Sequence, residues 1–391
     1  MTHDVVLLTQ QLVRLRTVND PEAGTAEAPA AAVVEELMRS FGWPVQVEEV
    51  APGRPNVIAV VDGGGGPGPT LLFEGHTDVV TEGERDTWTV DPYSGDIVDG
   101  VLWGRGSADM KSGVAAMIHA TRRLQLDGPF PGRIVVAALV DEEGMMLGAK
   151  HFARSALAAE VDAAIVCEPE AGEVCTCAKG ALRLRVALRG AMAHGAMPHQ
   201  GRNPILPLAS LLAAVAGYER ELGERFGEHE HLGRVYLTPT VVQAGRREQG
   251  NVIPAEAFVH LDVRSVPGVD HAEVIARVGA LASAAGEAHG VTASVEVVDD
   301  RPPVEIPADS PIAAAVLGAH QAVTGEPGRI GGVPGTTDGT ILFRDASIPS
   351  VVYGPGGKWI AHQADEFVAV DEIVTSMNVY TEAARRFLTG E

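Results

Sequence analysis

The stretch TLLFEGHTD, residues 70–78, decides the fold class of this chain. Its apolar run Leu71–Phe73 is typical of a strand buried on both faces, as in a sheet covered by helices. Similar runs occur at 56–61, 134–140 and 163–167. A glycine-rich turn leads into a predicted helix over 111–126, and such alternation of buried strands with helices indicates an α/β sheet.

The middle of the chain has a different pattern. Residues 182–189 (LRLRVALR) and 258–264 (FVHLDVR) alternate between apolar and polar, as antiparallel strands with one wet face do. The remaining predicted elements here are helices starting at 203–204 and 270 and strands over 235–244 and 291–298. Their order is β-α-β-β-α-β, which predicts a ferredoxin-like domain over 180–297. It would be inserted into an α/β domain made of 1–179 and 298–391.

The bulk composition limits the classes of function. With 30 Lys and Arg against 52 Asp and Glu, the 391-residue chain has a formal charge of −22. Such a charge repels nucleic acids and anionic membrane surfaces, so neither is expected as a partner. Three cysteines predict free, buried or partly buried thiols and not a disulfide framework. An amphipathic N-terminal helix without a long apolar run favours the cytoplasm.

Chemically active side chains follow the predicted buried strands. His76 ends the first, and Asp78 can hold its second ring nitrogen, as carboxylates do beside zinc-bound histidines. Glu142 and Glu143 end another strand in a cluster of acids, whose mutual repulsion a cation would remove; a solvated acidic turn is the alternative. Glu168 ends a third strand.

Asp109 lies where the glycine-rich turn enters the helix over 111–126. It either caps that helix or bridges two cations with its two carboxylate oxygens. One histidine and several carboxylates at the ends of strands of one sheet suit a hydrolytic site for zinc or a similar divalent ion. Sequence motifs of serine hydrolases, phosphate loops and helix-borne zinc sites are absent.

Seven motifs together resemble a known family. They are GHTDVV, GRGSADMKSG, DEEG, CEPE, GAMAHGAMPHQGRNPI, NVIPAE and GPGGKWIAHQADEF. The resemblance is to the co-catalytic zinc family of acetylornithine deacetylase, succinyl-diaminopimelate desuccinylase, aminoacylase and glutamate carboxypeptidase. It implies a zinc-peptidase-like catalytic domain, with a mixed sheet sandwiched by helices, and an inserted α+β ferredoxin-like domain that serves as lid and dimerisation surface.

The resemblance also implies residue roles. The ligands of two divalent ions, zinc with cobalt or manganese as alternatives, would be His76 and Glu168 for one ion, Glu143 and His362 for the other, and Asp109 as the bridge. Asp78 would orient His76, Glu142 would be the general base, and His194 would stabilise the oxyanion across a homodimer. Arg264 and Asn251 match positions that bind the substrate carboxylate. Thr337 and Asp338 match a loop near the substrate.

The implied reaction is hydrolysis of a linear amide by a hydroxide that bridges the two ions. The predicted substrate is an N-acyl amino acid, with an acetyl group preferred. One departure guides this preference: residues 179–182 read KGAL, where the desuccinylase pattern has an arginine pair. A dipeptidase or carboxypeptidase, a desuccinylase, and a non-catalytic binding protein of the same fold are the alternatives.

Overall fold

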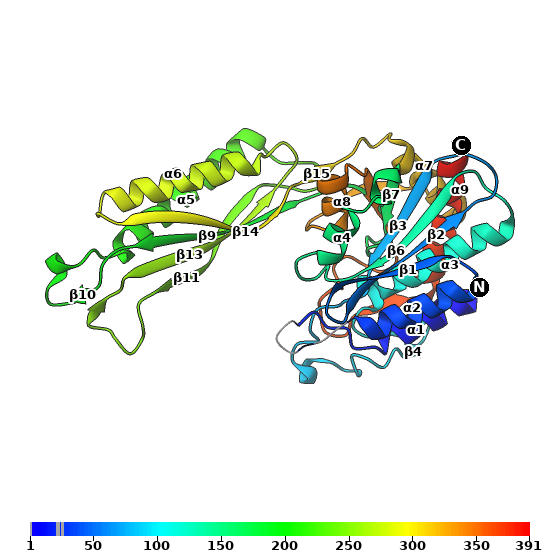
Figure 1. Cartoon of the computed structure of the whole chain (residues 1–391), viewed down its shortest axis with the longest axis horizontal. Helices are drawn as coiled ribbons and strands as arrows, with labels where there is room; N and C mark the ends of the chain where they lie inside the picture. The colour runs from blue at the N-terminus through cyan, green and yellow to red at the C-terminus, as the bar shows by residue number, and fades with distance from the viewer. Residues whose placement is uncertain (1, 21–23, 25–26) are drawn as a thin grey trace. The chain divides into compact units, whose positions relative to one another are not determined.

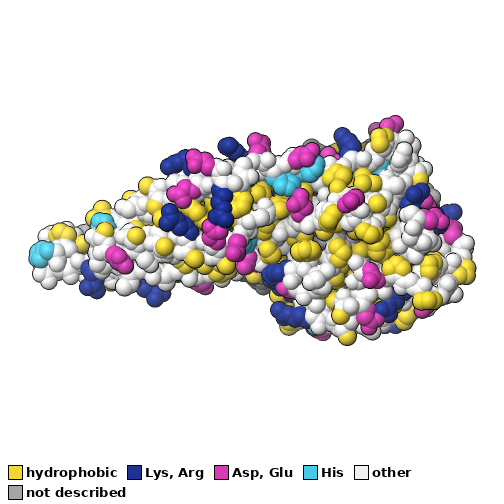
Figure 2. Space-filling view, turned by 90° about the horizontal axis from the view of Figure 1, so that it is seen from above, with side chains coloured by type: hydrophobic (Ala, Val, Ile, Leu, Met, Phe, Trp, Pro, Cys, Tyr) yellow, Lys and Arg dark blue, Asp and Glu magenta, His cyan; other side chains and the backbone are white. Residues whose placement is uncertain are grey.

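The computed structural model describes residues 2–20, 24 and 27–391. These residues form two compact units. Unit 1 comprises the chain up to Thr176 together with Ile306–Val333 and Thr337–Glu391, and unit 2 comprises Cys177–Glu305 with Pro334–Thr336. Charged side chains of both signs are interspersed with hydrophobic ones over the face that Figure 2 draws.

Unit 1 is built on a mixed sheet (Figure 1) with the strand order β1-β2-β6-β3-β7-β17-β8. The strands are, in that order, Val45–Ala51, Arg54–Asp62, Arg133–Leu139, Thr70–His76, Ala163–Val166, Ser350–Val352 and Glu173–Ala178. β3 runs parallel to β6 and β7, and β17 runs parallel to β7. The pairs β1–β2, β2–β6 and β17–β8 are antiparallel.

Two smaller strands complete this sheet, and both pair with β8. They are β16 (Arg329–Val333) and β15 (Val304–Glu305), and β15 pairs with the last two residues of β8. A separate small sheet has the order β18-β5-β4, with the strands Phe367–Ala369, Val101–Trp103 and Ile97–Val98.

Both faces of the central strands are buried, as their apolar runs predict. Leu71 and Phe73 of β3 belong to a core shared with five helices, whereas Leu72 between them points to the opposite face, and all three are fully buried. The five helices are α1 (Thr2–Val13), α2 (Ala28–Ser40), α3 (Ser112–Asp127), α7 (Pro311–Thr324) and α9 (Val370–Thr389). The short helices α4 (Leu147–Phe152) and α8 (Asp338–Ala346) contact each other and strands of the sheet.

Unit 2 has the predicted ferredoxin-like order. Its elements are β9 (Gly180–Arg189), α5 (Ile205–Phe226), β11 (Tyr236–Ala244), β13 (Glu256–Ser265), α6 (His271–Glu287) and β14 (Thr292–Arg301). The four strands form an antiparallel sheet in the order β11-β13-β9-β14. A two-residue ladder joins β10 (Ala193–His194) to β12 (Val252–Ile253).

Local sequence signals explain where several helices begin. The carboxylate of Asp270 accepts a hydrogen bond from the backbone N–H of Ala272, as its capping pattern predicts. α9 begins at Val370 and has Asp371 in its first turn, where a carboxylate interacts favourably with the positive end of the helix dipole. All three cysteines are free and buried, as predicted.

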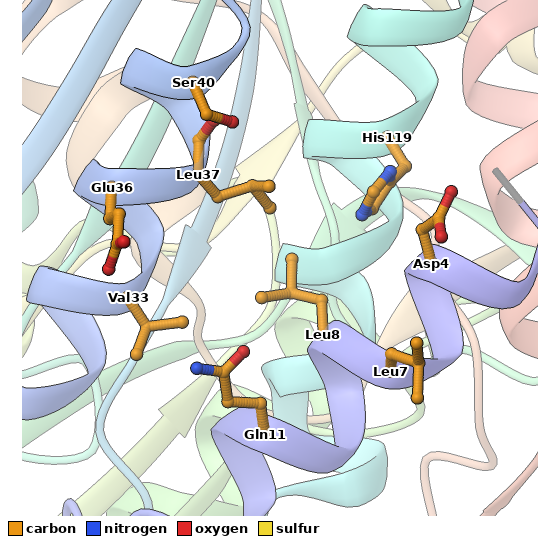
Figure 3. Close-up of a pocket in the computed structure, with 9 residues that line it drawn as sticks. All are labelled: Asp4, Leu7, Leu8, Gln11, Val33, Glu36, Leu37, Ser40 and His119. Carbon is orange, nitrogen blue, oxygen red and sulfur yellow. The ribbon is translucent and has the colours of Figure 1, made fainter.

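Helices α1, α2 and α3 leave a pocket of about 350 Å³ between them. Figure 3 shows the ring of His119 extending from α3 toward Leu8 and Leu37, which belong to the apolar lining. His119 is 3% exposed, and its two ring nitrogens have no hydrogen-bond partner within the described part of the chain. Burial lowers the pKa of His119 to about 4. Within residues 2–20, 24 and 27–391, no helix is long and apolar enough to cross a membrane.

The depressed pKa of His119 predicts a pH dependence of stability. Between pH 4 and about 6.5, the unfolded chain protonates this histidine and the folded chain does not. The free energy of unfolding therefore falls as the pH falls through this window, by up to about 1.4 kcal/mol per pH unit. We expect His119→Phe to remove this contribution, so its stability relative to the wild type should rise between pH 7 and pH 5 in urea titrations. His289→Phe, at an exposed site, is the control; a pH-independent difference for His119→Phe would contradict the argument.

Candidate metal centre

Parallel strands bring the predicted ligands to one edge of the sheet. His76 is the last residue of β3, Glu143 lies in the turn after β6, and Glu168 follows β7 by two residues. Because β6, β3, β7 and β17 run in the same direction, their carboxyl ends meet at the same edge, where α/β enzymes place their sites. His362 lies in the segment that follows β17, and Asp109 lies in the turn that leads into α3.

The ligand atoms form two clusters that share one residue. In the first, Nε2 of His76 lies 3.2 Å from Oδ1 of Asp109 and 3.3 Å from Oε1 of Glu168. In the second, Nε2 of His362 lies 3.2 Å from Oδ2 of Asp109 and 3.0 Å from Oε1 of Glu143. Within each cluster, one ligand atom from every residue lies within 4.8 Å of the others. The two oxygens of Asp109 thus face different clusters, which is the arrangement of a bridging carboxylate.

Negative charge is concentrated at this edge. Burial and the neighbouring Asp109 raise the pKa of Glu168 to about 8. Burial also raises the pKa values of Glu142 and Glu143, and the charge of Asp109 adds to the effect at Glu143. Carboxylates so buried and so close stay ionised only beside positive charge. Imidazole and carboxylate donors without cysteine suit zinc and similar divalent ions, so the residues fit a pair of such ions.

A third acidic cluster lies nearby but is already neutralised. Glu170, Glu173 and Cys175 also have ligand atoms within 4.8 Å of one another. The ammonium of Lys358 lies 2.7 Å from the carboxylate of Glu170 and 2.9 Å from that of Glu173. The lysine therefore takes the place that a metal ion would need.

Asp78 supports both clusters. Nδ1 of His76 lies 3.0 Å from the backbone oxygen of Asp78 and 3.5 Å from its carboxylate, so the main chain makes the closer contact. The carboxylate accepts hydrogen bonds from the backbone N–H groups of Glu142 and Glu143 and from the amide of Asn19. One carboxylate therefore links the loop of His76 to the turn that carries Glu142 and Glu143.

The predicted lid residues lie in unit 2. His194 is exposed, and the backbone N–H of its neighbour Gly195 donates to the backbone oxygen of Asn251 at 2.7 Å, which places these two segments together. Arg264 lies on β13, where its guanidinium contacts the carboxylate of Asp262 at 2.8 Å. Its charge also contributes, after burial, to lowering the pKa of Lys179.

The loop residues Thr337 and Asp338 lie in unit 1, at the start of α8, and both are buried. Burial, and then the charges of Asp338 and Glu168, raise the pKa of Glu74 well above its ordinary value. Asp338 and Glu74 are therefore part of the same acidic surroundings as the first ligand cluster.

Several supporting residues went unrecognised in the sequence. Asn19 carries no local signal, because it lies in an irregular segment far along the chain from its partner Asp78. Arg105 and Glu366 each belong to a family motif but carry no role predicted from it. They form a buried ion pair that joins the Asp109 turn to the segment after His362.

Comparisons with known proteins identify the family of this chain. The model of the peptidase family M20/M25/M40 matches residues 72–386. A succinyl-diaminopimelate desuccinylase of Cereibacter sphaeroides is 31% identical over 402 residues, covering 100% of both chains. A desuccinylase of Stenotrophomonas maltophilia is also 31% identical, over 98% of this chain and 99% of its own.

Solved structures share the fold. The M20 family metallo-carboxypeptidase of Sulfolobus solfataricus aligns with a TM-score of 0.80 and 18% identity, covering 98% of this chain and 99% of its own. A dinuclear metal-binding M20 peptidase of Bacillus subtilis aligns with a TM-score of 0.75 and 16% identity, over 99% and 98% of the two chains. The predicted α/β fold with an inserted α+β domain is confirmed. The chain belongs to the peptidase family M20/M25/M40, and it is a metal-dependent hydrolase of amide bonds.

Proposed function

We propose that the chain removes a succinyl group from an N-succinyl amino acid, with two divalent ions, preferably zinc, held by the two clusters around Asp109. The shared carboxylate of Asp109 is the observation that carries the two-ion site, because its oxygens face His76 on one side and His362 on the other. The proposed ligands are His76, Asp109, Glu143, Glu168 and His362.

The choice of acyl group rests on the relatives. Those of about 31% identity over the whole chain are named succinyl-diaminopimelate desuccinylase, which favours a succinyl over an acetyl group. The stretch 179–182 lacks an arginine pair, yet Lys179 supplies one cation there. Its ammonium donates to the backbone oxygen of Arg234 and lies 4.6 Å from the centre of the Tyr236 ring. Arg264 of β13 lies opposite Ala181 of β9, two residues from Lys179, so we assign these two cations of unit 2 to a substrate with two carboxylates.

Each residue then has a task in the reaction. When bound, the two ions polarise the amide carbonyl and make a water molecule acidic enough to attack at neutral pH. Glu142, which is 8% exposed, takes the proton of that water and delivers it to the leaving amine. Asp78 fixes the orientation of His76 and of the turn that holds Glu142. His194 donates a hydrogen bond to the developing oxyanion, and Asn251, Arg264, Thr337 and Asp338 position the substrate.

The role of Glu142 gives a direct test. Glu142→Gln keeps the size of the side chain but removes its ability to accept a proton, so we expect kcat to fall at least about 10²-fold. Metal content, measured by elemental analysis, should stay at the wild-type value. Glu84→Gln, on the surface of the same unit, is the control and should leave both quantities unchanged. Near wild-type turnover in Glu142→Gln would show that another group is the base.

The substrate class is tested by amine release from a panel of N-succinyl amino acids, N-acetyl amino acids and dipeptides. We expect the highest kcat/KM with N-succinyl substrates and a large loss in Lys179→Met for these substrates only, because the second carboxylate then lacks its cation. Faster amine release from N-acetyl substrates would instead favour the deacetylase function predicted from the sequence. Release from dipeptides alone would favour a peptidase.

We also propose that unit 2 is a lid and joins two copies of the chain, so that His194 acts in the partner's site. β11 lies at one edge of the sheet of unit 2, whereas β9 and β13 lie inside it. The edge strand β11 is largely exposed, with Val241 and Val242 exposed by 49% and 53%. An exposed apolar edge strand readily pairs with another chain.

The cytoplasmic location stays a prediction of the sequence.

Charge on this edge should separate the copies. We expect Val242→Lys to shift the wild-type dimer toward monomer in sedimentation velocity and to lower kcat as His194 is withdrawn. Val98→Lys, at an equally exposed valine of unit 1, should do neither. A wild-type protein that is monomeric and fully active at the same concentration would rule out the shared site.

A further inference from the structure

The placement of His362 requires support from outside its own loop. Its side chain is 53% exposed, so apart from the contacts of its Nε2 with Asp109 and Glu143, packing contributes little to holding it. Its backbone also has a φ of +65°, which costs a non-glycine residue on the order of 1–3 kcal/mol unless neighbouring structure maintains it. Asp365, three residues later, has a φ of +56°. Such a segment keeps its conformation only when its ends are fixed.

Glu366 fixes one end of this segment, and it does so on the turn that carries Asp109. The residue is fully buried. Its Oε1 accepts hydrogen bonds from three backbone N–H groups, those of Gly106 at 3.1 Å, Ala108 at 3.0 Å and Asp109 at 3.0 Å. The turn is thus wrapped around a single carboxylate oxygen, four residues along the chain from His362.

Arg105 completes this arrangement from the other side. Its guanidinium forms a buried ion pair with Oε2 of Glu366 and is itself only 2% exposed. The guanidinium also lies 5.2 Å from the centre of the Trp88 ring. Hydrogen bonds in which one partner is charged are about twice as strong as those between neutral groups, and the guanidinium of Arg105 is always charged, so this contact helps to hold the Glu366 side chain in place.

The other end of the segment is fixed independently. Lys358, on the N-terminal side of His362, forms ion pairs with Glu170 and Glu173. At the same end as Glu366, Asp365 accepts hydrogen bonds from the backbone N–H and the hydroxyl of Thr89. These contacts hold the segment to the body of unit 1. Of these contacts of the segment, those of Glu366 reach the backbone of Asp109, a residue of both ligand clusters.

We propose that Glu366 is a positioning residue of the metal centre, which sets the separation between the carboxylate of Asp109 and the imidazole of His362. The proposal rests on the proposed two-ion site. Asp109 contacts both clusters, so a shift of its turn alters the geometry at each ion. The effect should be larger at the ion held by Asp109, Glu143 and His362, because there both displaced segments contribute ligands.

The test is the metal affinity of Glu366→Gln, measured by competition with a chromophoric zinc chelator, together with the visible absorption spectrum of the cobalt-loaded protein. The amide keeps the size of the carboxylate, but its NH₂ group must face either Arg105 or the three backbone donors. We expect the zinc affinity of the site formed by Asp109, Glu143 and His362 to fall about 10- to 100-fold, as for other residues that orient metal ligands, and the cobalt spectrum to change. A residue that only stabilises the fold would leave the spectrum unchanged.

Asp299→Asn is the matched control. Asp299 is 5% exposed and pairs with Arg301 at 2.7 Å, so its loss also breaks a buried ion pair, but in unit 2. Its zinc affinities and cobalt spectrum should equal those of the wild type. Arg105→Lys provides a second variant if Glu366→Gln does not fold, since it keeps the charge and loses the planar fork. It should change the cobalt spectrum in the same direction.

The outcomes are distinguishable. A wild-type protein that binds no divalent ion at these residues would overturn the proposed two-ion site itself. A wild type that binds two ions, with a folded Glu366→Gln of equal affinity and equal spectrum, would overturn only the role of Glu366. A wild-type spectrum in Arg105→Lys, where Glu366→Gln cannot be purified, would overturn that role as well.

Discussion

The repulsion among buried carboxylates at the carboxyl edge of the sheet is the constraint on which the rest of the structure depends. Glu142, Glu143, Glu168 and Asp109 lie within one small region, and burial raises the pKa values of the three glutamates. Isolated carboxylates in such surroundings would take up protons. The fold places them there after two parallel strands, β6 and β7, and in the turn that leads into α3, which holds their charges in a geometry that divalent ions can neutralise.

Several acidic side chains near this region, outside the two ligand clusters, form ion pairs with basic side chains. Arg54 contacts Glu27 and Asp141, Lys358 contacts Glu170 and Glu173, and Arg105 contacts Glu366. Each pair removes a carboxylate from the set that could compete for a cation. These ion pairs neutralise five acids near the proposed two-ion site, which leaves fewer carboxylates to compete with the two clusters for a cation.

The sequence predicts the framework well where patterns are local. The apolar runs of β2, β3, β6 and β7 and the alternation in β9 and β13 give the two units and most of their elements, because burial imposes a period on each strand. His76, Glu143 and Glu168 lie at or just after the ends of such strands, and Asp109 lies in the glycine-rich turn before α3. His362 does not: it lies in an irregular, exposed loop, and only the family motif pointed to it. Asn19 and Glu366 act through contacts 59 and 257 residues away in the chain, which no local pattern encodes.

The position of β17 has a consequence for synthesis on the ribosome. This strand lies between β7 and β8 in the sheet, although it is separated from both in sequence by the whole of unit 2. A nascent chain therefore makes β6, β3 and β7 early, yet the gap beside β7 closes only after residue 352 has been added. During that interval the edge of β7 is unpaired on the side of β17. The proposed ligands His76, Asp109, Glu143 and Glu168 have been synthesised, but His362 has not. We thus expect unit 2, which is continuous apart from three residues, to complete its folding before unit 1 does.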